Sequence, residues 1–224
     1  MGKNKRIASI VAIVIAACLI MAWIDAVIKP GYALKSIVKL GLFTLLPLLY
    51  CIVFKESFTK ILHLSSKSLK TAVLLGAGVY AFILGAYFVL SPLFDFTRVT
   101  TALQNNIGVN KDNFVFVALY ISFINSLLEE FFFRGVAFLM LRRLTGNRFA
   151  NIFSAMAFAL YHIAIMTSWF SFGLFVLLIA GLFAAGVLFN ILDGKYNNIY
   201  VSWLVHMFAN FSINTIGFIL FGLI

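Results

Sequence analysis

Charged residues and cysteines are both scarce in this sequence. Of its 224 residues, 11% are charged and 63% are hydrophobic, whereas an average soluble domain has about 25% charged and about 45–50% apolar residues. This shortage of charge excludes a water-soluble globule and a disordered chain. The two cysteines, Cys18 and Cys51, both lie in apolar runs. They therefore provide neither a disulfide framework nor the spacing of a zinc knuckle.

The hydrophobic residues form runs long enough to cross a bilayer. About 20 apolar residues in a helix span the hydrocarbon core, and such runs lie at 7–28, 36–54, 71–93, 114–141, 149–168, 171–192 and 198–223. The fourth run is long enough to tilt, to project beyond the membrane or to break into two pieces. A short re-entrant or interfacial helix at 94–110 would add an eighth element. We therefore predict an all-α, polytopic transmembrane bundle of seven to eight membrane helices, with residues 1–224 as a single integral-membrane domain.

The net charge of +10 does not indicate nucleic-acid binding, because the basic residues lie between apolar runs, where they set membrane topology. If the N-terminus is cytoplasmic, 11 basic residues fall on the cytoplasmic side and 5, among them Lys35 and Lys39, fall on the other. The positive-inside rule thus predicts a cytoplasmic N-terminus and, with seven crossings, a C-terminus on the opposite side. The first apolar run is long enough to span, so we expect an uncleaved helix rather than a signal peptide.

Two adjacent glutamates lie inside the fourth apolar run. A charge at the centre of a membrane helix costs about 2.5–3.5 kcal/mol, so ionisable residues there are candidates for function. Arg134 follows Glu130 by four residues, which places both on one helix face. Glu129 points about 100° away around the helix and is left without an obvious partner. A purely structural ion cluster needs only one carboxylate, so the second one favours a chemical role.

Polar residues also interrupt the fifth and seventh runs. His162 lies in the fifth run, and four residues spaced four apart form one stripe on the seventh: Ser202, His206, Asn210 and Asn214. The stripe must face the bundle interior or a wet cavity, because lipid offers no hydrogen-bond partners. Counted from the nearest basic residue, Glu129, His162 and His206 each lie about 16–21 Å along their helices. Three helices are therefore predicted to bring a carboxylate and two imidazoles to one depth.

Such a set of groups suits hydrolysis of an amide bond. A carboxylate beside an imidazole can hold a water molecule and remove its proton. A second imidazole, with an amide one helical turn away, can donate hydrogen bonds to a developing oxyanion. The sequence thus favours an enzyme with a water-containing site inside the membrane.

Three short motifs carry these residues: Glu129-Glu130-x-x-x-Arg134, Phe158-x-x-x-His162 and His206-x-x-x-Asn210. In this order, on separate membrane helices, they resemble the motifs of the CPBP intramembrane proteases, also called the Abi or type II CAAX prenyl endopeptidase family. The resemblance covers about residues 114–215, which would be the catalytic core. It implies a peptidase, a CAAX-type intramembrane endopeptidase that depends on glutamate or on a metal.

The resemblance also implies a role for each motif residue. Glu129 would be the base that activates water, with His162 as its partner. His206 and Asn210 would form the oxyanion site. Glu130 and Arg134 would be a supporting pair.

No cofactor is required by the sequence, and we favour a metal-free mechanism. Zinc is the alternative, because two histidines and a glutamate (Glu129, His162 and His206) can bind Zn²⁺ with water in the fourth position. The implied partner is a membrane-embedded or lipidated peptide within the lipid bilayer. For a bacterial chain this means the plasma membrane and peptide processing rather than prenylated substrates.

Two other classes of function remain open. A non-catalytic bacteriocin self-immunity or membrane scaffold protein of the same family would use the polar residues only to hold helices or a partner. A proton-coupled transporter would use Glu129 and the histidines as a proton relay. The transporter is disfavoured because the chain has no inverted repeats and no pair of helices broken by glycine or proline.

Overall fold

The computed structural model describes residues 2–59, 61–63, 66–166 and 169–224, and this part of the chain is all-helical. Seven of its helices are long and apolar enough to cross a membrane: Lys3–Ile28, Tyr32–Phe54, Ser68–Leu90, Phe114–Thr145, Asn147–Met166, Phe172–Tyr196 and Tyr200–Leu220. They coincide with the seven predicted runs to within a few residues. The last two positions of the run at 149–168 lie outside the described residues. The predicted fold class is confirmed.

The helical elements follow one another with short connections. In chain order they are α1 (Lys3–Trp23), η1 (Ile24–Ile28), α2 (Tyr32–Phe54), α3 (Ser66–Leu90), α4 (Thr97–Ile107), α5 (Phe114–Tyr120), η2 (Ile121–Asn125), α6 (Ser126–Glu129), η3 (Glu130–Met140), α7 (Leu141–Thr145), α8 (Asn147–Tyr161), α9 (Ile163–Met166), α10 (Phe172–Tyr196) and α11 (Tyr200–Leu220). The three η elements are π-helical. The fourth crossing is therefore one continuous helix from α5 to α7 with two π-helical stretches, and it does not break into two pieces.

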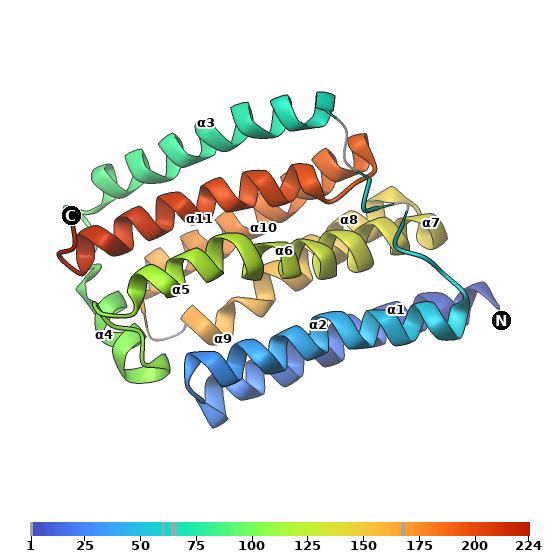
Figure 1. Ribbon diagram of the computed structural model, residues 1–224, viewed down its shortest axis with the longest axis horizontal. Coiled ribbons are helices and arrows are strands. Elements are labelled where there is room, and N and C mark those ends of the chain that lie inside the picture. The colour runs from blue at the N-terminus through green and yellow to red at the C-terminus, as the bar shows by residue number, and fades with distance from the viewer. Residues whose placement is uncertain (1, 60, 64–65, 167–168) are drawn as a thin grey trace.

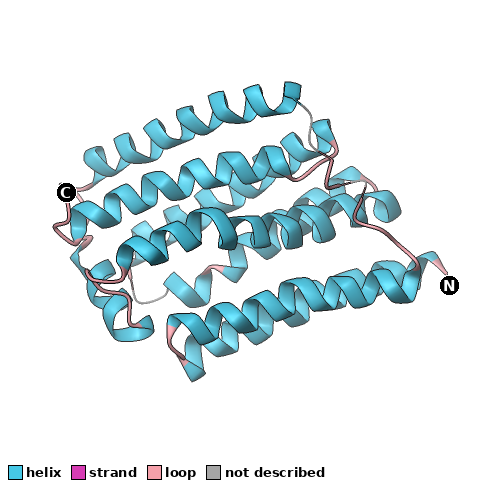
Figure 2. Cartoon of the chain, viewed as in Figure 1, coloured by secondary structure: helices cyan, strands magenta, loops and turns pink. Residues whose placement is uncertain are grey.

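The crossings run side by side along the long axis of the bundle (Figure 1). Helix α3 packs on α11, α10 packs on α8, and α1 and α2 pair on the other side of the fourth crossing. The N- and C-termini lie at opposite ends, as an odd number of crossings requires. The short helix expected at 94–110 is present as α4, at the end of the bundle near the C-terminus (Figure 2).

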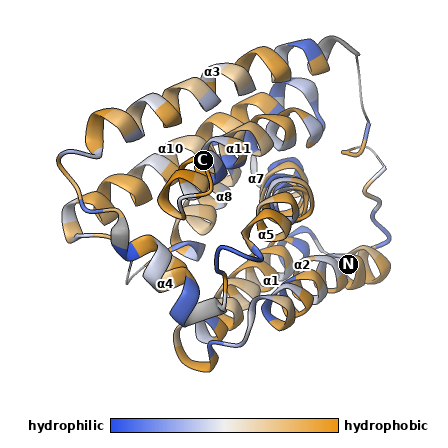
Figure 3. Cartoon of the chain, turned by 60° about the vertical axis from the view of Figure 1, so that its left-hand side comes forward, coloured by the Kyte–Doolittle hydropathy of each residue, from blue (hydrophilic) through white to orange (hydrophobic). Residues whose placement is uncertain are grey.

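Hydrophobic residues predominate along the helices (Figure 3). Large residues such as Leu19, Phe82 and Phe116 are 64–74% exposed. Contiguous apolar surface of this extent is unfavourable in water and favourable in lipid. The bundle therefore presents the surface of a membrane protein, with its polar side chains turned inward.

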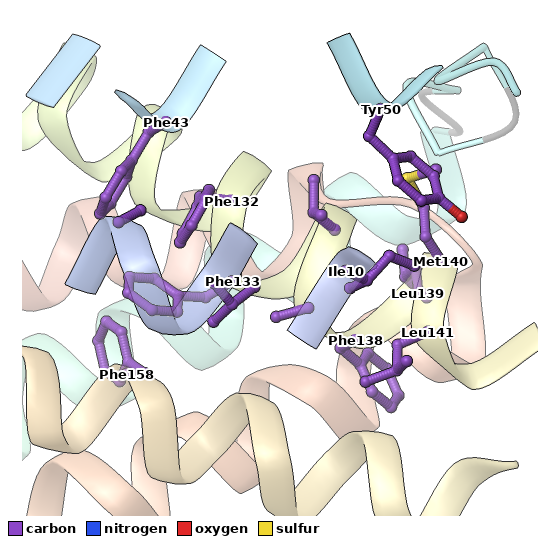
Figure 4. Packing of buried hydrophobic residues seen from close by; sticks show 14 of the residues in the cluster. Ile10, Phe43, Tyr50, Phe132, Phe133, Phe138, Leu139, Met140, Leu141 and Phe158 are labelled. Carbon is purple, nitrogen blue, oxygen red and sulfur yellow. The ribbon is translucent and has the colours of Figure 1, made fainter. Parts of the chain in front are cut away.

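Aromatic packing fixes α2 beside the fourth crossing. The rings of Phe43 on α2 and Phe132 on η3 are stacked with their centroids 4.0 Å apart, and Phe133 meets Phe43 edge-on at 5.6 Å (Figure 4). All three side chains are fully buried. Such pairs add about 0.5–1.5 kcal/mol beyond the apolar area that they bury. The contact holds α2 in register with the polar residues one turn away on the fourth crossing.

A glycine allows α10 to approach α8 closely. A Cβ added at Gly186 would lie 2.9 Å from Ala155 Cα, which is closer than such atoms can approach. A larger residue at this position would push the two helices apart. The close approach brings Phe189, one turn further along α10, against His206, whose ring centroid lies 5.7 Å away.

Two of the lysines that the topology count assigned to the non-cytoplasmic side are buried. Lys35 and Lys39 were assigned to the non-cytoplasmic side, but both are buried within the bundle, at 9% and 4% exposure. Lys35 Nζ lies 2.5 Å from Asp25 Oδ1. Because paired, buried lysines do not report on the membrane surface, they leave the count. The difference between the two sides then grows, and the expectation of a cytoplasmic N-terminus is unchanged.

Candidate active site

The polar stripe on α11 faces the interior of the bundle, as its spacing predicts. All four of its residues are at most 8% exposed, and each has a partner on another element. Ser202 donates from its backbone nitrogen and its Oγ to the carboxylate of Asp193 on α10, at 3.0 and 2.6 Å. The stripe therefore ties α11 to its neighbours along most of its length.

Two amides of this stripe contact the fourth crossing near its first π-helical stretch. Asn210 Nδ2 donates to the carbonyl of Ile121 at 3.1 Å. Asn214 Nδ2 donates to the carbonyl of Ala118 at 3.1 Å and to Ser122 Oγ at 2.9 Å. A π-helical turn disturbs the regular α-helical bonding pattern and is frequent at functional sites. Side chains of α11 thus stabilise an irregular backbone just before the two glutamates.

Glu129 meets both membrane histidines. Glu129, a residue only 3% exposed, is the last residue of α6. His162 follows the last residue of α8, and His206 lies on α11. Glu129 Oε2 lies 3.9 Å from His162 Nε2 and 3.8 Å from His206 Nε2. These distances confirm the prediction that three helices bring a carboxylate and two imidazoles to one depth.

The far side of each imidazole is fixed by a hydrogen bond. His162 Nδ1 lies 2.7 Å from the carbonyl oxygen of Phe158, and His206 Nδ1 lies 2.7 Å from Glu130 Oε1. A carbonyl or a carboxylate oxygen only accepts, so Nδ1 carries the hydrogen in both rings. In the neutral state, each Nε2 therefore presents its lone pair towards Glu129.

Glu130 and Arg134 form the pair that their spacing predicts. Arg134 Nε lies 3.2 Å from Glu130 Oε2, and both side chains are completely buried. The guanidinium lies over the rings of Phe158 and Phe189, at 4.0 and 4.9 Å from their centroids. Since Glu130 also accepts a hydrogen bond from His206 Nδ1, the pair fixes the imidazole on the side opposite to Glu129.

The expectation that Glu129 has no partner was wrong. Lys39 Nζ on α2 lies 2.5 Å from Glu129 Oε1 and 2.6 Å from Asn125 Oδ1. Asn125 Nδ2 donates to the same Glu129 oxygen at 3.0 Å. Asn125 lies four residues before Glu129 on the same crossing, a spacing that places two side chains on one helix face. Lys39 lies 90 residues earlier in the chain, where no spacing rule finds it. The signal available in the sequence was a lysine inside an apolar run.

The proposed zinc ligands Glu129, His162 and His206 do not fit a metal ion in this arrangement. Among the residues that the structure describes, no three histidine, cysteine, aspartate or glutamate side chains are grouped to hold one. Two donors at about 2.0–2.2 Å from a tetrahedral zinc ion lie about 3.3–3.6 Å apart, whereas the distances from Glu129 Oε2 to the two Nε2 atoms are 3.8 and 3.9 Å. The ammonium of Lys39 on the same carboxylate also opposes a second cation there. We derive no chemical step through a metal.

The comparison with known families agrees with the motifs. Residues 111–212 match the family described as type II CAAX prenyl endopeptidase Rce1-like. The match contains all six predicted site residues, whereas α1, α2 and α3 lie outside it. Neither the curated proteins nor the solved structures contain a match to this chain. Residues 111–212, a little under half of the chain, are therefore similar to the Rce1-like family of type II CAAX prenyl endopeptidases, which are CPBP proteases.

Proposed function

We propose that this protein is an intramembrane endopeptidase that hydrolyses a peptide bond in a membrane-embedded or lipidated peptide. The observation that carries the proposal is the convergence of Glu129 Oε2 with two imidazole Nε2 atoms inside the bundle, at 3.8 and 3.9 Å. The family match supports a peptidase. The catalytic core would comprise residues 114–215, in a membrane protein whose N-terminus is cytoplasmic.

In this proposal Glu129 is the general base. Contacts of 3.8–3.9 Å are too long for direct hydrogen bonds but are readily bridged by one water molecule with bonds of about 2.8 Å. The water would donate one hydrogen to Glu129 Oε2 and the other to His162 Nε2. Glu129 would take a proton as the water oxygen bonds to the peptide carbonyl carbon. That proton would pass to the leaving nitrogen as the C–N bond breaks, which releases a carboxylic acid and an amine.

His206 and Asn210 would stabilise the oxyanion of the tetrahedral intermediate. His206 Nδ1 already donates to Glu130, so Nε2 can donate only when the ring carries both protons. Asn210 Nδ2 donates one hydrogen to the Ile121 carbonyl. Its second hydrogen would be donated to the oxyanion.

Replacement of the converging residues tests the proposal. The protein is reconstituted in proteoliposomes with a farnesylated CAAX peptide, and with its palmitoylated counterpart, each carrying a fluorophore and a quencher. We expect Glu129→Gln, His162→Ala and His206→Ala each to lower kcat by about 10²–10⁴-fold, the usual contribution of a general acid or base. The matched control is Glu56→Gln, which removes a glutamate that pairs with Arg6 away from the site.

The outcomes separate the function classes. Wild-type hydrolysis by Glu129→Gln would contradict the proposed mechanism, in which Glu129 is the general base. If the wild-type protein cleaves neither peptide but confers immunity to a bacteriocin, and Glu129→Gln retains that immunity, the scaffold class is favoured instead.

A further inference from the structure

A buried lysine outside the family match contacts the residue proposed as the base. Lys39 lies on α2, two helices away in sequence from the first residue that the family match covers. Its side chain is 5% exposed, and its ammonium is surrounded by two oxygens and two aromatic rings. Nζ lies 5.3 Å from the centroid of Phe43 and 5.0 Å from that of Tyr161. The position of this charge is therefore tightly defined.

Stability alone does not account for a charge at this site. A lysine inside a membrane helix is costly, and a buried ion pair is often no more stable than well-packed apolar residues of the same volume. The neighbouring Phe43 shows that α2 and the fourth crossing can pack through apolar contacts at this level. What distinguishes Lys39 is the atom that it binds.

The two oxygens of the Glu129 carboxylate have different partners, because Lys39 binds only one of them. Oε1 accepts from Lys39 Nζ at 2.5 Å and from Asn125 Nδ2 at 3.0 Å. Asn125 Oδ1 in turn accepts from Nζ at 2.6 Å, so the three groups form a closed triangle. With Oε1 occupied in this way, the carboxylate cannot rotate freely, and Oε2 is left facing the two imidazoles.

We propose that Lys39 is a positioning residue, which holds the Glu129 carboxylate so that Oε2 faces the two imidazoles. This inference rests on the proposed function. The lysine acts through Glu129 and does not touch the substrate. Its loss should therefore lower kcat and leave KM nearly unchanged. Misplacement of a catalytic group by about 1 Å can cost about 10²-fold in rate.

The test compares two lysines on the same helix. Lys39→Met removes the charge that binds Glu129, and Lys35→Met is the matched control. Lys35 lies one turn earlier on α2 and is also buried. Its removal leaves the carboxylate of Asp25, and not that of Glu129, without its lysine partner. Both variants are reconstituted, checked for folding by thermal unfolding, and assayed with the farnesylated peptide. We expect Lys39→Met to lower kcat about 10–100-fold with KM nearly unchanged, and Lys35→Met to keep the wild-type kcat.

Two further variants keep the test decisive. Asn125→Ala removes the amide that bonds both Lys39 and Glu129, and it leaves the ion pair between them intact. We expect it to lower kcat by less than Lys39→Met does. In the double variant Lys39→Met/Glu129→Gln, loss of the lysine should cost nothing beyond Glu129→Gln, because the two side chains act as a unit.

The assignment of Lys39 would be overturned by a wild-type kcat in Lys39→Met, or by equal losses of kcat in Lys35→Met and Lys39→Met. If Glu129→Gln is inactive in the same assay, the proposed function is retained in either case. Full activity of Glu129→Gln would instead contradict the proposed function itself. If Lys39→Met does not fold, wild-type kcat in Asn125→Ala would overturn the positioning role.

Discussion

Replacement of Arg134 by methionine is expected to be among the most destabilising single changes in the bundle. The Arg134 and Glu130 side chains have no exposed surface, so solvent does not weaken their interaction. Removal of one partner from such a pair costs about 3–5 kcal/mol, because the other charge stays buried. Glu130 would keep its hydrogen bond from His206, which places the expected loss near the lower end of that range.

The double variant Glu130→Gln/Arg134→Met separates the pair from simple packing. With both charges removed, no ion is stranded, and replacement of a whole buried pair is often nearly neutral. We therefore expect the double variant to be more stable than Arg134→Met alone. Arg142→Met is a control on the same crossing, since Arg142 donates to two neutral acceptors, the Gly194 carbonyl and Asn197 Oδ1.

Reversible unfolding in mixed detergent micelles, followed by tryptophan fluorescence, measures these free energies. A value for Arg134→Met within about 1 kcal/mol of wild type, the level of an ordinary exposed pair, would refute the reasoning. The single variant Glu130→Gln is measured in the same way. A double variant whose loss equals the sum of the losses in Glu130→Gln and Arg134→Met would refute the reasoning as well, because the two side chains would then be independent.

Two further predictions concern metal dependence and the anchoring of α11. Removal of metal ions by a chelator should leave kcat for the farnesylated peptide unchanged, because Lys39 supplies the positive charge beside Glu129. Lost activity that returns with Zn²⁺ would contradict this. Ser202→Ala should lower the free energy of unfolding by about 1–3 kcal/mol, since buried Asp193 loses a donor at 2.6 Å. An unchanged unfolding free energy in the same micelle assay would show that this bond contributes nothing.

Contacts that depend on position along a helix were predictable from the sequence. The bilayer sets the register of each crossing, so counting from the basic residues at the helix ends placed Glu129, His162 and His206 at one depth. The four-residue spacing of Glu130 and Arg134 predicted their pair for a similar reason. Both predictions need only the rise and the period of a helix.

Contacts between helices that are remote in the chain were not predictable in this way. The pairing of Lys39 with Glu129 depends on how α2 rotates against the fourth crossing, which side-chain packing decides. The bond from Ser202 to Asp193 likewise depends on the turn between α10 and α11. The π-helical stretches at Ile121–Asn125 and Glu130–Met140 also carry no spacing signal, because their hydrogen-bond pattern is stabilised by tertiary contacts.

The proposed mechanism depends most on Glu129 and His162 acting together on one water molecule. The most direct test is the rate of peptide hydrolysis by Glu129→Gln/His162→Ala, compared with each single variant in the same proteoliposomes. Groups that act as a unit give strongly non-additive losses. We therefore predict that the double variant is no slower than the slower single variant. A double variant in which the two losses multiply would show that the two side chains act independently and would contradict the proposed site.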